Sequence, residues 1–321
     1  MLLFALRRLG AAAIVVFLVV TIVFALSRLV PGQPLIGDPE RHRSDPARVE
    51  RMRRRFGLDQ PLATQYARYL SRTARGDLGE SLVLRRPVLD LLRERLPNTA
   101  LLAGAALLLT FALGLALASV QATRPGSGAD TAGGAFALVF FSMPSFWLGL
   151  LLLFVFGQQL GWLPVGGMTE PVLHDRLSPA GRAADVLRHL LLPALTLALV
   201  QVSVVSRFER SALIDALASE HLRAARAAGL SRARVLRRAI RASLAPMITL
   251  AGTMTGSLLA GSVLVETVFG WPGLGRLTHD AIFARDYPLL AGSALLAGGC
   301  VALANLAADL ASHAADPRLP R

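Results

Sequence analysis

Six long runs without an acidic or basic residue divide this chain of 321 residues, and they constrain its fold more than any other feature. The runs are residues 9–27, 96–123, 131–169, 189–206, 242–265 and 287–308. Crossing a bilayer as a helix takes about 20 residues, with a range of roughly 17 to 25. Five of the runs meet that length directly or with some tilt. Because 54% of the residues are hydrophobic, we predict an all-α polytopic membrane protein.

The third run, residues 131–169, is too long for one straight span and too short for two spans with a turn. We predict one helix that bends near Pro144 and leaves the membrane around Gly161 and Trp162. The first run could alternatively belong to a signal peptide, because basic residues precede its apolar core. No A-x-A cleavage site follows it, so we expect an uncleaved first helix. The sequence therefore predicts six transmembrane helices.

Arg residues in the short loops predict that both termini lie in the cytoplasm. In this orientation the inner short segments carry 14 Arg residues and the outer short segments carry five. The predicted outer loop, residues 31–96, departs from this pattern because it holds 14 Arg and nine acidic residues. Loops longer than about 60 residues translocate largely regardless of charge. Leu62, Tyr66, Tyr69 and Leu70 recur at helical spacing within this loop, so we expect it to be a partly helical, solvated amphipathic segment.

All 34 basic residues are Arg, and the absence of Lys excludes two kinds of chemistry. A P-loop needs the Lys of G-x-x-x-x-G-K-[ST] to reach the phosphates, so we expect no ATPase site in this chain. Schiff-base catalysis needs a Lys as well. The single Cys300 excludes an intramolecular disulfide, and the six His residues are not spaced as metal ligands. We therefore predict no catalytic residue, no metal and no cofactor in this chain.

The most basic stretch, EHLRAARAAGLSRARVLRRAI (220–240), lies between two apolar runs. Apolar residues of its second half, among them Val235 and Ala239, follow a helical repeat, and Arg residues occupy the other side. Ser231 is a favourable N-cap for this helix. Gly229 stands where a residue in the left-handed conformation would close a preceding helix. The pattern predicts two short helices joined by a tight turn.

Three functions are compatible with this basic hairpin, residues 211–245. A basic amphipathic helix can lie on anionic lipid. Nucleic-acid binding is disfavoured by so Ala-rich a turn inside a polytopic chain. The third possibility is a rigid knob that docks into a groove of another protein, and the small side chains at the turn would allow close approach. The amphipathic pattern alone does not separate lipid from protein, and Pro246 is expected to mark the start of the next span.

The hairpin resembles the E-A-A-x-x-x-G loop of ABC importer permeases of the dipeptide, oligopeptide and nickel subfamily. There the loop typically reads close to D-Y-V-R-T-A-R-A-K-G-L. This chain reads EHLRAARAAGL and departs at His221 and Ala228, where the family often has Tyr and Lys. The likeness runs nearly from end to end, although VPGQP (30–34) differs mildly from the family's P-G-D-P. The motifs that carry it are FGLDQPLATQYARYL (56–70), RGDLGESL (75–82), RPVLDLLRERLPNTALLA (86–103), SMPSFWLGLLL (142–152), LGWLP (160–164), HLLLPALTLAL (189–199), VLVETVFGWPGLGRL (263–277), ARDYP (284–288) and DPRLP (316–320).

The resemblance implies a type I ABC importer permease fold, with six transmembrane helices and a cytoplasmic coupling hairpin. The chain would be the permease subunit of an ATP-driven importer in the bacterial inner membrane. Its implied partners are a second homologous permease, two cytoplasmic ATPase subunits that bind ATP and Mg, and an extracytoplasmic solute-binding protein. The implied divisions are a first transmembrane helix (1–30), an extracytoplasmic segment (31–96), a permease core (97–313) containing the hairpin 211–245, and a cytoplasmic tail (314–321).

Two groups of site residues follow from the resemblance. The candidate coupling residues, which would contact an ATPase subunit, are Glu220, His221, Arg223, Ala224, Ala225, Arg226 and Gly229. The candidate residues of an outer gate or a binding-protein dock are Glu266, Trp271 and Gly273. An alternative is that Trp271 is an interfacial anchor, because Trp is enriched at that membrane depth in general.

An ion-coupled secondary transporter is the alternative function. Such proteins usually place ionisable residues near the bilayer midplane, whereas Glu266 and Asp309 of this chain lie near the ends of apolar runs. A membrane-embedded enzyme would need paired acids or a nucleophile at depth. Peptides are the expected cargo, with nickel and glutathione left open, because the resemblance assigns substrate choice largely to the separate binding protein.

Overall fold

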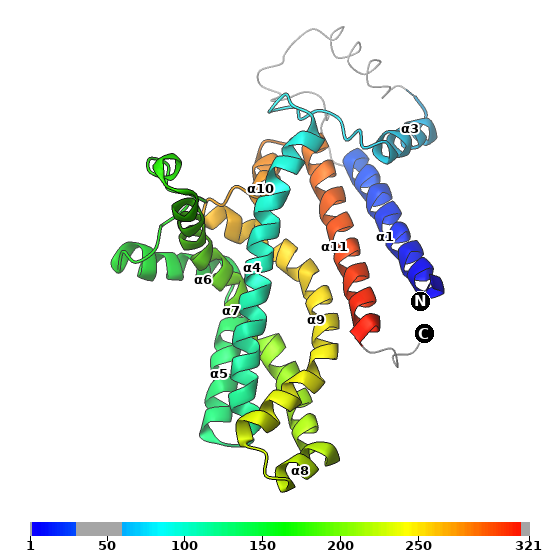
Figure 1. The fold of residues 1–321 in the computed structure, drawn as a ribbon. Coiled ribbons are helices and arrows are strands. Elements are labelled where there is room, and N and C mark those ends of the chain that lie inside the picture. The colour runs from blue at the N-terminus through cyan, green and yellow to red at the C-terminus, as the bar shows by residue number, and fades with distance from the viewer. Residues whose placement is uncertain (1, 30–59, 316–321) are drawn as a thin grey trace. The chain divides into compact units, whose positions relative to one another are not determined.

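The computed structural model describes residues 2–29 and 60–315, and these residues are mostly helical (Figure 1). The helices are α1 (Leu2–Leu29), α3 (Leu62–Ala74), α4 (Val88–Thr123), α5 (Gly128–Ser142), α6 (Ser145–Leu152), η1 (Leu153–Gln159), η2 (His174–Arg176), α7 (Pro179–Ala218), α8 (Glu220–Ala227), α9 (Arg232–Val268), α10 (Leu274–Phe283) and α11 (Tyr287–Ala315). Within the described ranges no strand forms, and Glu80 and Pro87 make an isolated bridge. The VPGQP motif, the rest of residues 31–59 and the predicted tail from residue 316 lie outside the described residues.

Three of the described helices are long and apolar enough to cross a membrane. They are Val88–Thr123, Pro179–Ala218 and the part of α11 from Tyr287 to Ala311. A fourth span results if α5 and the α6–η1 segment are counted together, and α1 contains a shorter apolar segment, Leu9–Ala25. These helices support a multi-pass membrane protein, and the count of six remains a prediction.

The predicted bend at Pro144 is a break between two helices. α5 ends at Ser142, α6 begins at Ser145, and the two segments are bent by 104°. Met143 between them is extended, with φ −84° and ψ 133°. The ring of a proline disfavours helical backbone at the residue before it, so Met143 cannot easily continue α5. The position of the bend is therefore confirmed, but two helices replace the single bent helix that we predicted.

α9 joins two segments that the sequence analysis separated. The second half of the basic hairpin and the apolar run 242–265 form one helix, Arg232–Val268. Pro246 therefore lies within a helix and does not begin one. A proline is tolerated in a membrane helix when neighbouring groups satisfy the freed backbone carbonyl. The hairpin is consequently continuous with a predicted membrane span on its C-terminal side.

The described chain divides into two compact units. One comprises Met1–Pro97 and Arg276–Leu303, and the other comprises Asn98–Gly275 and Ala304–Arg321. The main core of the second unit is built from α4, α6, α7 and α9. A Cβ on Gly114 of α4 would lie 2.5 Å from Cγ1 of Val205, so the glycine allows α4 and α7 to approach closely. The buried residues of this core are Leu102, Ala106, Leu148, Leu152, Leu190, Leu192, Ala194, Leu197, Leu199, Leu258, Val265, Phe269 and Trp271.

In the first unit, Asp286 attaches the segment before α4 to the start of α11. Ser81 Oγ donates to Asp286 Oδ2 at 2.5 Å, and the backbone N–H of Val83 donates to the same oxygen at 3.2 Å. The N–H of Leu289, in the first turn of α11, donates to Asp286 Oδ1 at 3.3 Å. Ser81 and Asp286 are both buried. The motifs RGDLGESL and ARDYP therefore meet at one buried carboxylate.

Candidate functional site

The predicted basic hairpin is present as the end of α7, the short helix α8 and the beginning of α9. Ser219 separates α7 from α8 with extended backbone, φ −64° and ψ 149°. Its hydroxyl donates to the carbonyl of Ala216 at 2.5 Å, in the last turn of α7. Ser231 occupies the predicted N-cap position of α9, although its side chain makes no capping bond to the helix. The chain therefore reverses direction within residues 219–231.

Gly229 closes α8 with the conformation that the sequence predicted. Its φ is +81°, and a Cβ at this position would meet open space. The N–H of Gly229 donates to the carbonyl of Arg226 at 3.0 Å, and the N–H of Leu230 donates to that of Ala225 at 3.1 Å. These two bonds form a Schellman motif, which satisfies carbonyls that the helix end would leave without partners. The turn therefore depends on a backbone conformation that L residues disfavour.

One side of α8 is anchored in a small hydrophobic core. Leu222 is fully buried and Ala225 is 7% exposed. They pack with residues of α4, α7 and α9, and the buried members of this cluster are Ala118, Ala122, Leu213, Leu222, Ala225, Val235 and Ala239. Burying a Leu side chain contributes roughly 1.5–3 kcal/mol. α8 is therefore attached to three long helices at once, and a force on α8 would reach all of them.

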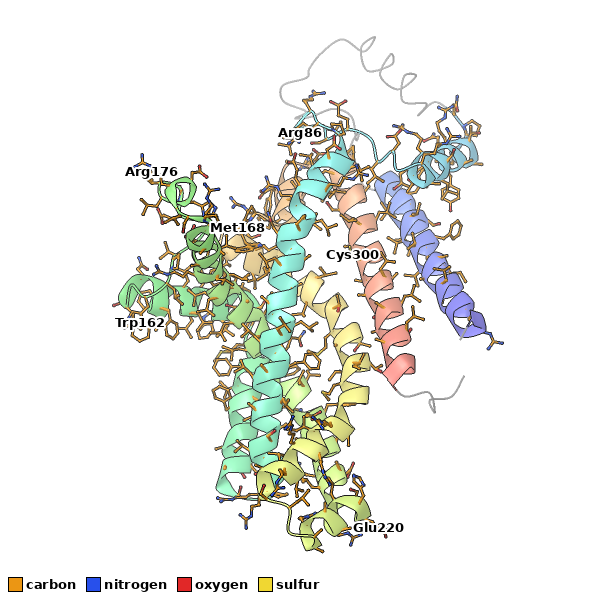
Figure 2. The ribbon with its side chains drawn as sticks, viewed as in Figure 1. Arg86, Trp162, Met168, Arg176, Glu220 and Cys300 are labelled. Carbon is orange, nitrogen blue, oxygen red and sulfur yellow. The ribbon has the colours of Figure 1, made fainter. Side chains whose placement is uncertain are left out.

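The opposite side of α8 is exposed and basic. Glu220, His221, Arg223 and Ala224 are exposed, and Glu220 is labelled at the start of α8 in Figure 2. The exposed Arg residues of the hairpin are Arg223, Arg226, Arg232, Arg234, Arg237, Arg238 and Arg241. Among the described residues, no group of three or more His, Cys, Asp or Glu could hold a metal ion. Because Arg residues predominate on this exposed side, the surface is suited to binding an acidic or hydrogen-bonding partner.

Two of the predicted coupling residues have structural contacts of their own. Ala225 is buried in the hydrophobic core under α8, so it is not part of the exposed side. Arg226 directs its guanidinium back to α7, where Nη2 donates to the carbonyl of Leu217, and Nε donates to the carbonyl of Leu222 at 3.4 Å. A cation at the Leu217 carbonyl, in the last turn of α7, compensates the partial negative charge of a helix C-terminus. Arg226 therefore holds α8 against α7.

A salt bridge that the sequence analysis missed connects α7 to α5. Arg210 Nε and Nη2 donate to the two carboxylate oxygens of Asp130 at 2.8 and 2.7 Å. Asp130 also accepts from the N–H of Gly126 at 2.9 Å, and its carbonyl accepts from Gln121 Nε2 at 3.1 Å. Bidentate Arg–carboxylate pairs are strong and directional. The available signal was weak, since Asp130 is simply the last acid before one apolar run and Arg210 follows another.

The neighbouring residue Glu209 connects α7 to α9. Its side chain is fully buried, and Ser243 Oγ donates to Glu209 Oε1 at 2.5 Å. Within the described part of the chain, Oε2 has no hydrogen-bond partner. Leu213, one turn further along α7, belongs to the core under α8. The end of α7 therefore contacts α5, α8 and α9 within the five residues 209–213.

The second candidate group, Glu266, Trp271 and Gly273, is buried in the interior of its unit. Trp271 is fully buried, and its Nε1 donates to the carbonyl of Asn98 at 3.0 Å. Asn98 Nδ2 in turn donates to the carbonyl of Pro272 at 2.8 Å. The alternative of an interfacial Trp271 is therefore wrong, because the turn folds back onto α4 and encloses the ring.

Glu266 and Gly273 belong to the same buried contact. Thr99 Oγ1 donates to Glu266 Oε1 at 2.8 Å and accepts from the N–H of Leu274 at 2.7 Å. A Cβ on Gly273 would lie 2.4 Å from Glu266 Oε2 and 2.5 Å from Thr99 Oγ1. No external protein can contact these buried side chains directly in this conformation, so the structure does not support a dock formed by them. A gate formed by this turn remains a prediction.

Comparison with protein families gives two matches that together cover the whole chain. Residues 1–103 match the N-terminal part, and residues 91–321 match the main part, of the family described as binding-protein-dependent transport system inner membrane component.

Individual relatives are similar over nearly their full length. The di/tripeptide transport system permease protein DppB of Pseudomonas aeruginosa is 40% identical over 332 residues, which cover 99% of each chain. The glutathione transport system permease protein GsiC of Salmonella paratyphi A is 36% identical over 322 residues, again 99% of each chain. Among solved structures, a chain of the inward-facing MetNI methionine ABC transporter aligns with a TM-score of 0.53 and 18% identity, covering 70% of this chain and 96% of that one. The structural likeness extends to the fold alone.

Proposed function

Because the chain belongs to the family of binding-protein-dependent transport system inner membrane components, we propose that it is the permease subunit of an ATP-driven ABC importer. The cargo we propose is peptides or related small solutes. The main support is full-length similarity to permease proteins of di/tripeptide and glutathione transport systems. In this function the chain forms half of a translocation path and takes its energy from separate ATPase subunits.

The proposed coupling element is the hairpin, with α8 as the part that enters a groove on an ATPase subunit. Three properties support this role. α8 exposes Glu220, Arg223 and Ala224, its other side is fixed to three long helices, and the absence of Lys leaves the chain without a P-loop. When nucleotide binding closes the ATPase subunits, movement of α8 would shift the helices between inward and outward access. Glu220, His221, Arg223, Ala224 and Gly229 are the proposed contact and turn residues.

The proposed assembly contains a second homologous permease, two cytoplasmic ATPase subunits that bind ATP and Mg, and an extracytoplasmic solute-binding protein. The family description names both binding-protein dependence and the inner membrane, which supports the last of these partners and the location. We place both termini in the cytoplasm and count six spans, formed by α1, α4, α5 with α6 and η1, α7, α9 and α11. The excess of Arg in the inner short loops supports this orientation.

The turn after α9 is the proposed outer gate. Its two buried contacts, Thr99 with Glu266 and Asn98 with Trp271, join the end of α9 and the turn after it to the first residues of the apolar part of α4. A gate of this kind would open by separating α4 from α9, and it would need no exposed contact residue. The solute-binding protein would then act on other parts of the outer surface.

Reconstitution in vesicles tests the proposed function. The complete complex should take up labelled dipeptide or tripeptide when ATP and binding protein are supplied, and it should not do so without ATP. Ala224→Trp should abolish uptake, because Ala224 lies on the exposed side of α8. Ala242→Trp is the matched control, since Ala242 is also exposed but lies three turns into α9. Uptake by this chain alone under a proton gradient would contradict the proposal and favour an ion-coupled transporter.

A further inference from the structure

The helix α3 has two different sides, although it is short and lies outside the long spans. Its residues Ala63, Ala67, Leu70 and Ala74 form one apolar stripe, and the adjoining stripe contains Leu62, Tyr66 and Tyr69. Arg68, Arg72 and Arg75 lie on the opposite side, and Thr64 and Ser71 flank the stripe of Ala residues. None of the residues of α3 is buried, and Leu62 is 63% exposed. The apolar side of α3 is therefore largely uncovered by this chain.

Contacts with α1 fix where this helix lies. Tyr66 and Thr21 share a hydrogen bond of 2.6 Å between their hydroxyl groups. The ring of Phe24 lies 5.2 Å from that of Tyr66 and 5.5 Å from that of Tyr69, measured between ring centroids. Figure 1 shows α3 running across the C-terminal end of α1. α3 is thus held at the level where the apolar segment Leu9–Ala25 ends.

Exposed apolar residues run along α1 toward the end that contacts α3. Ile14, Leu18 and Ile22 follow one another along α1, and their exposed fractions are 61%, 50% and 54%. In a membrane helix, such a stripe faces lipid chains. Phe17, four residues before Thr21 and seven before Phe24, lies on the side of α1 that contacts α3, and it is 50% exposed. The apolar side of α3 therefore continues the lipid-facing surface of α1 at its membrane boundary, where Tyr side chains are enriched.

The three Arg residues on the basic side of α3 differ in the hydrogen bonds that they make. Arg72 Nε donates to Asp77 Oδ2 at 2.8 Å, and this hydrogen bond lowers the pKa of the Asp77 carboxyl group. Arg68 makes one contact, from Nη2 to Gln60 Oε1 at 3.0 Å, and has further donors available. The Arg75 side chain is exposed and has no partner among residues 60–315 or 2–29. Arg68 and Arg75 lie on one stripe of this side.

We propose that α3 is an interfacial helix that inserts its apolar side into the lipid leaflet around the end of α1 and binds lipid phosphates through Arg68 and Arg75. A helix with one apolar and one basic side is stable in this plane, with its apolar side at the boundary between headgroups and acyl chains. Guanidinium groups bind phosphate by bidentate hydrogen bonds. The leaflet is the extracytoplasmic one in the proposed topology. The helix would keep the end of α1 at a fixed depth.

Spin labels on the two sides of α3 test the insertion. Cys300→Ser removes the single native thiol, and cysteines then replace Ala63, Ala67, Arg68 or Arg72, all of which are exposed. The full transporter is reconstituted in vesicles of phosphatidylcholine and phosphatidylglycerol. We expect labels at 63 and 67 to collide more often with oxygen than with a water-soluble nickel chelate. Labels at 68 and 72 should show the reverse preference.

Two results would overturn the insertion. If all four labels prefer the nickel chelate, α3 lies in water. If the labels at 63 and 67 are shielded from both reagents, another protein covers the apolar side. The measurement does not depend on uptake, so its failure is distinct from failure of the proposed transport function.

Spin-labelled phosphatidylglycerol tests the phosphate contacts in the same vesicles. We expect Arg68→Gln and Arg75→Gln each to reduce the preference of the protein for phosphatidylglycerol over phosphatidylcholine. Arg72→Gln is the matched control, because it removes the same charge from the same helix at a position engaged by Asp77. An equal reduction by all three variants, or by none, would contradict specific binding through Arg68 and Arg75.

Discussion

Replacing Gly229 with Val perturbs the coupling turn through the backbone alone. The residue has φ +81°, and a Cβ would meet no atom within 4 Å, so the substitution introduces no steric clash with other residues. An L residue in left-handed backbone costs about 1–2 kcal/mol, and a β-branched one is disfavoured further. A cost of 1–2 kcal/mol shifts an equilibrium by roughly 5- to 30-fold. The population of the Schellman turn that ends α8, relative to conformations without it, should therefore fall by that factor in the variant.

Uptake by reconstituted vesicles, together with copurification of the ATPase subunits, measures the consequence. We expect Gly229→Val to insert into the membrane normally, to lose uptake and to retain less ATPase subunit. Gly229→Asn should be affected least, because Asn tolerates left-handed backbone better than other non-glycine residues. Gly79→Val is the control, since Gly79 has φ +83° and open space but lies outside the hairpin. It should retain the ATPase subunits. Wild-type uptake by Gly229→Val would refute the reasoning.

Three other substitutions test the contacts that hold the hairpin and the buried turn after α9 in place. Leu222→Ala should destabilise the packing of α8 by about 2–5 kcal/mol, because Leu222 is fully buried. Amide hydrogen exchange of α8 should therefore become faster, and an unchanged exchange rate would contradict the proposed anchoring of α8. Asp130→Asn should lower the melting temperature by weakening the charge-assisted contact to Arg210, and Asp130→Glu should restore part of the loss; equal losses in both variants would argue against the ion pair. Gly273→Ala should reduce the yield of folded protein in detergent, because its Cβ would lie 2.4 Å from Glu266 Oε2; a normal yield would mean that the turn adjusts easily.

The sequence allowed the hairpin to be predicted in detail because its signals are local. Gly229 adopts the expected left-handed conformation, Ser231 is the expected N-cap position, and Val235 and Ala239 are buried as the helical repeat indicated. Pro144 likewise marks the end of one helix and the start of another. Each of these features depends on backbone preferences of one or two residues, which do not require knowledge of distant contacts.

Features that depend on distant contacts were missed. Arg210 lies 80 residues from Asp130, and no local pattern indicates that they pair. Trp271 was predicted to belong to an outer gate or dock, with an interfacial anchor as the alternative, because Trp next to Pro and Gly at a span end is typical of membrane boundaries. The Trp271 side chain is instead buried and donates a hydrogen bond to Asn98, which is 173 residues away in the sequence. Ala225 was predicted to contact an ATPase subunit, but it follows Leu222 by three residues and shares the buried side of α8 with it.

Crosslinking from the exposed side of α8 tests most directly whether this hairpin contacts a separate motor subunit. A cysteine at Ala224, in a chain carrying Cys300→Ser, should crosslink to an ATP-hydrolysing subunit of the assembled transporter. A cysteine at the neighbouring Ala225 should not, because that position is only 7% exposed. Labelling of the Ala224 cysteine by a membrane-impermeant reagent added outside intact cells, with no crosslink to an ATPase, would contradict the account.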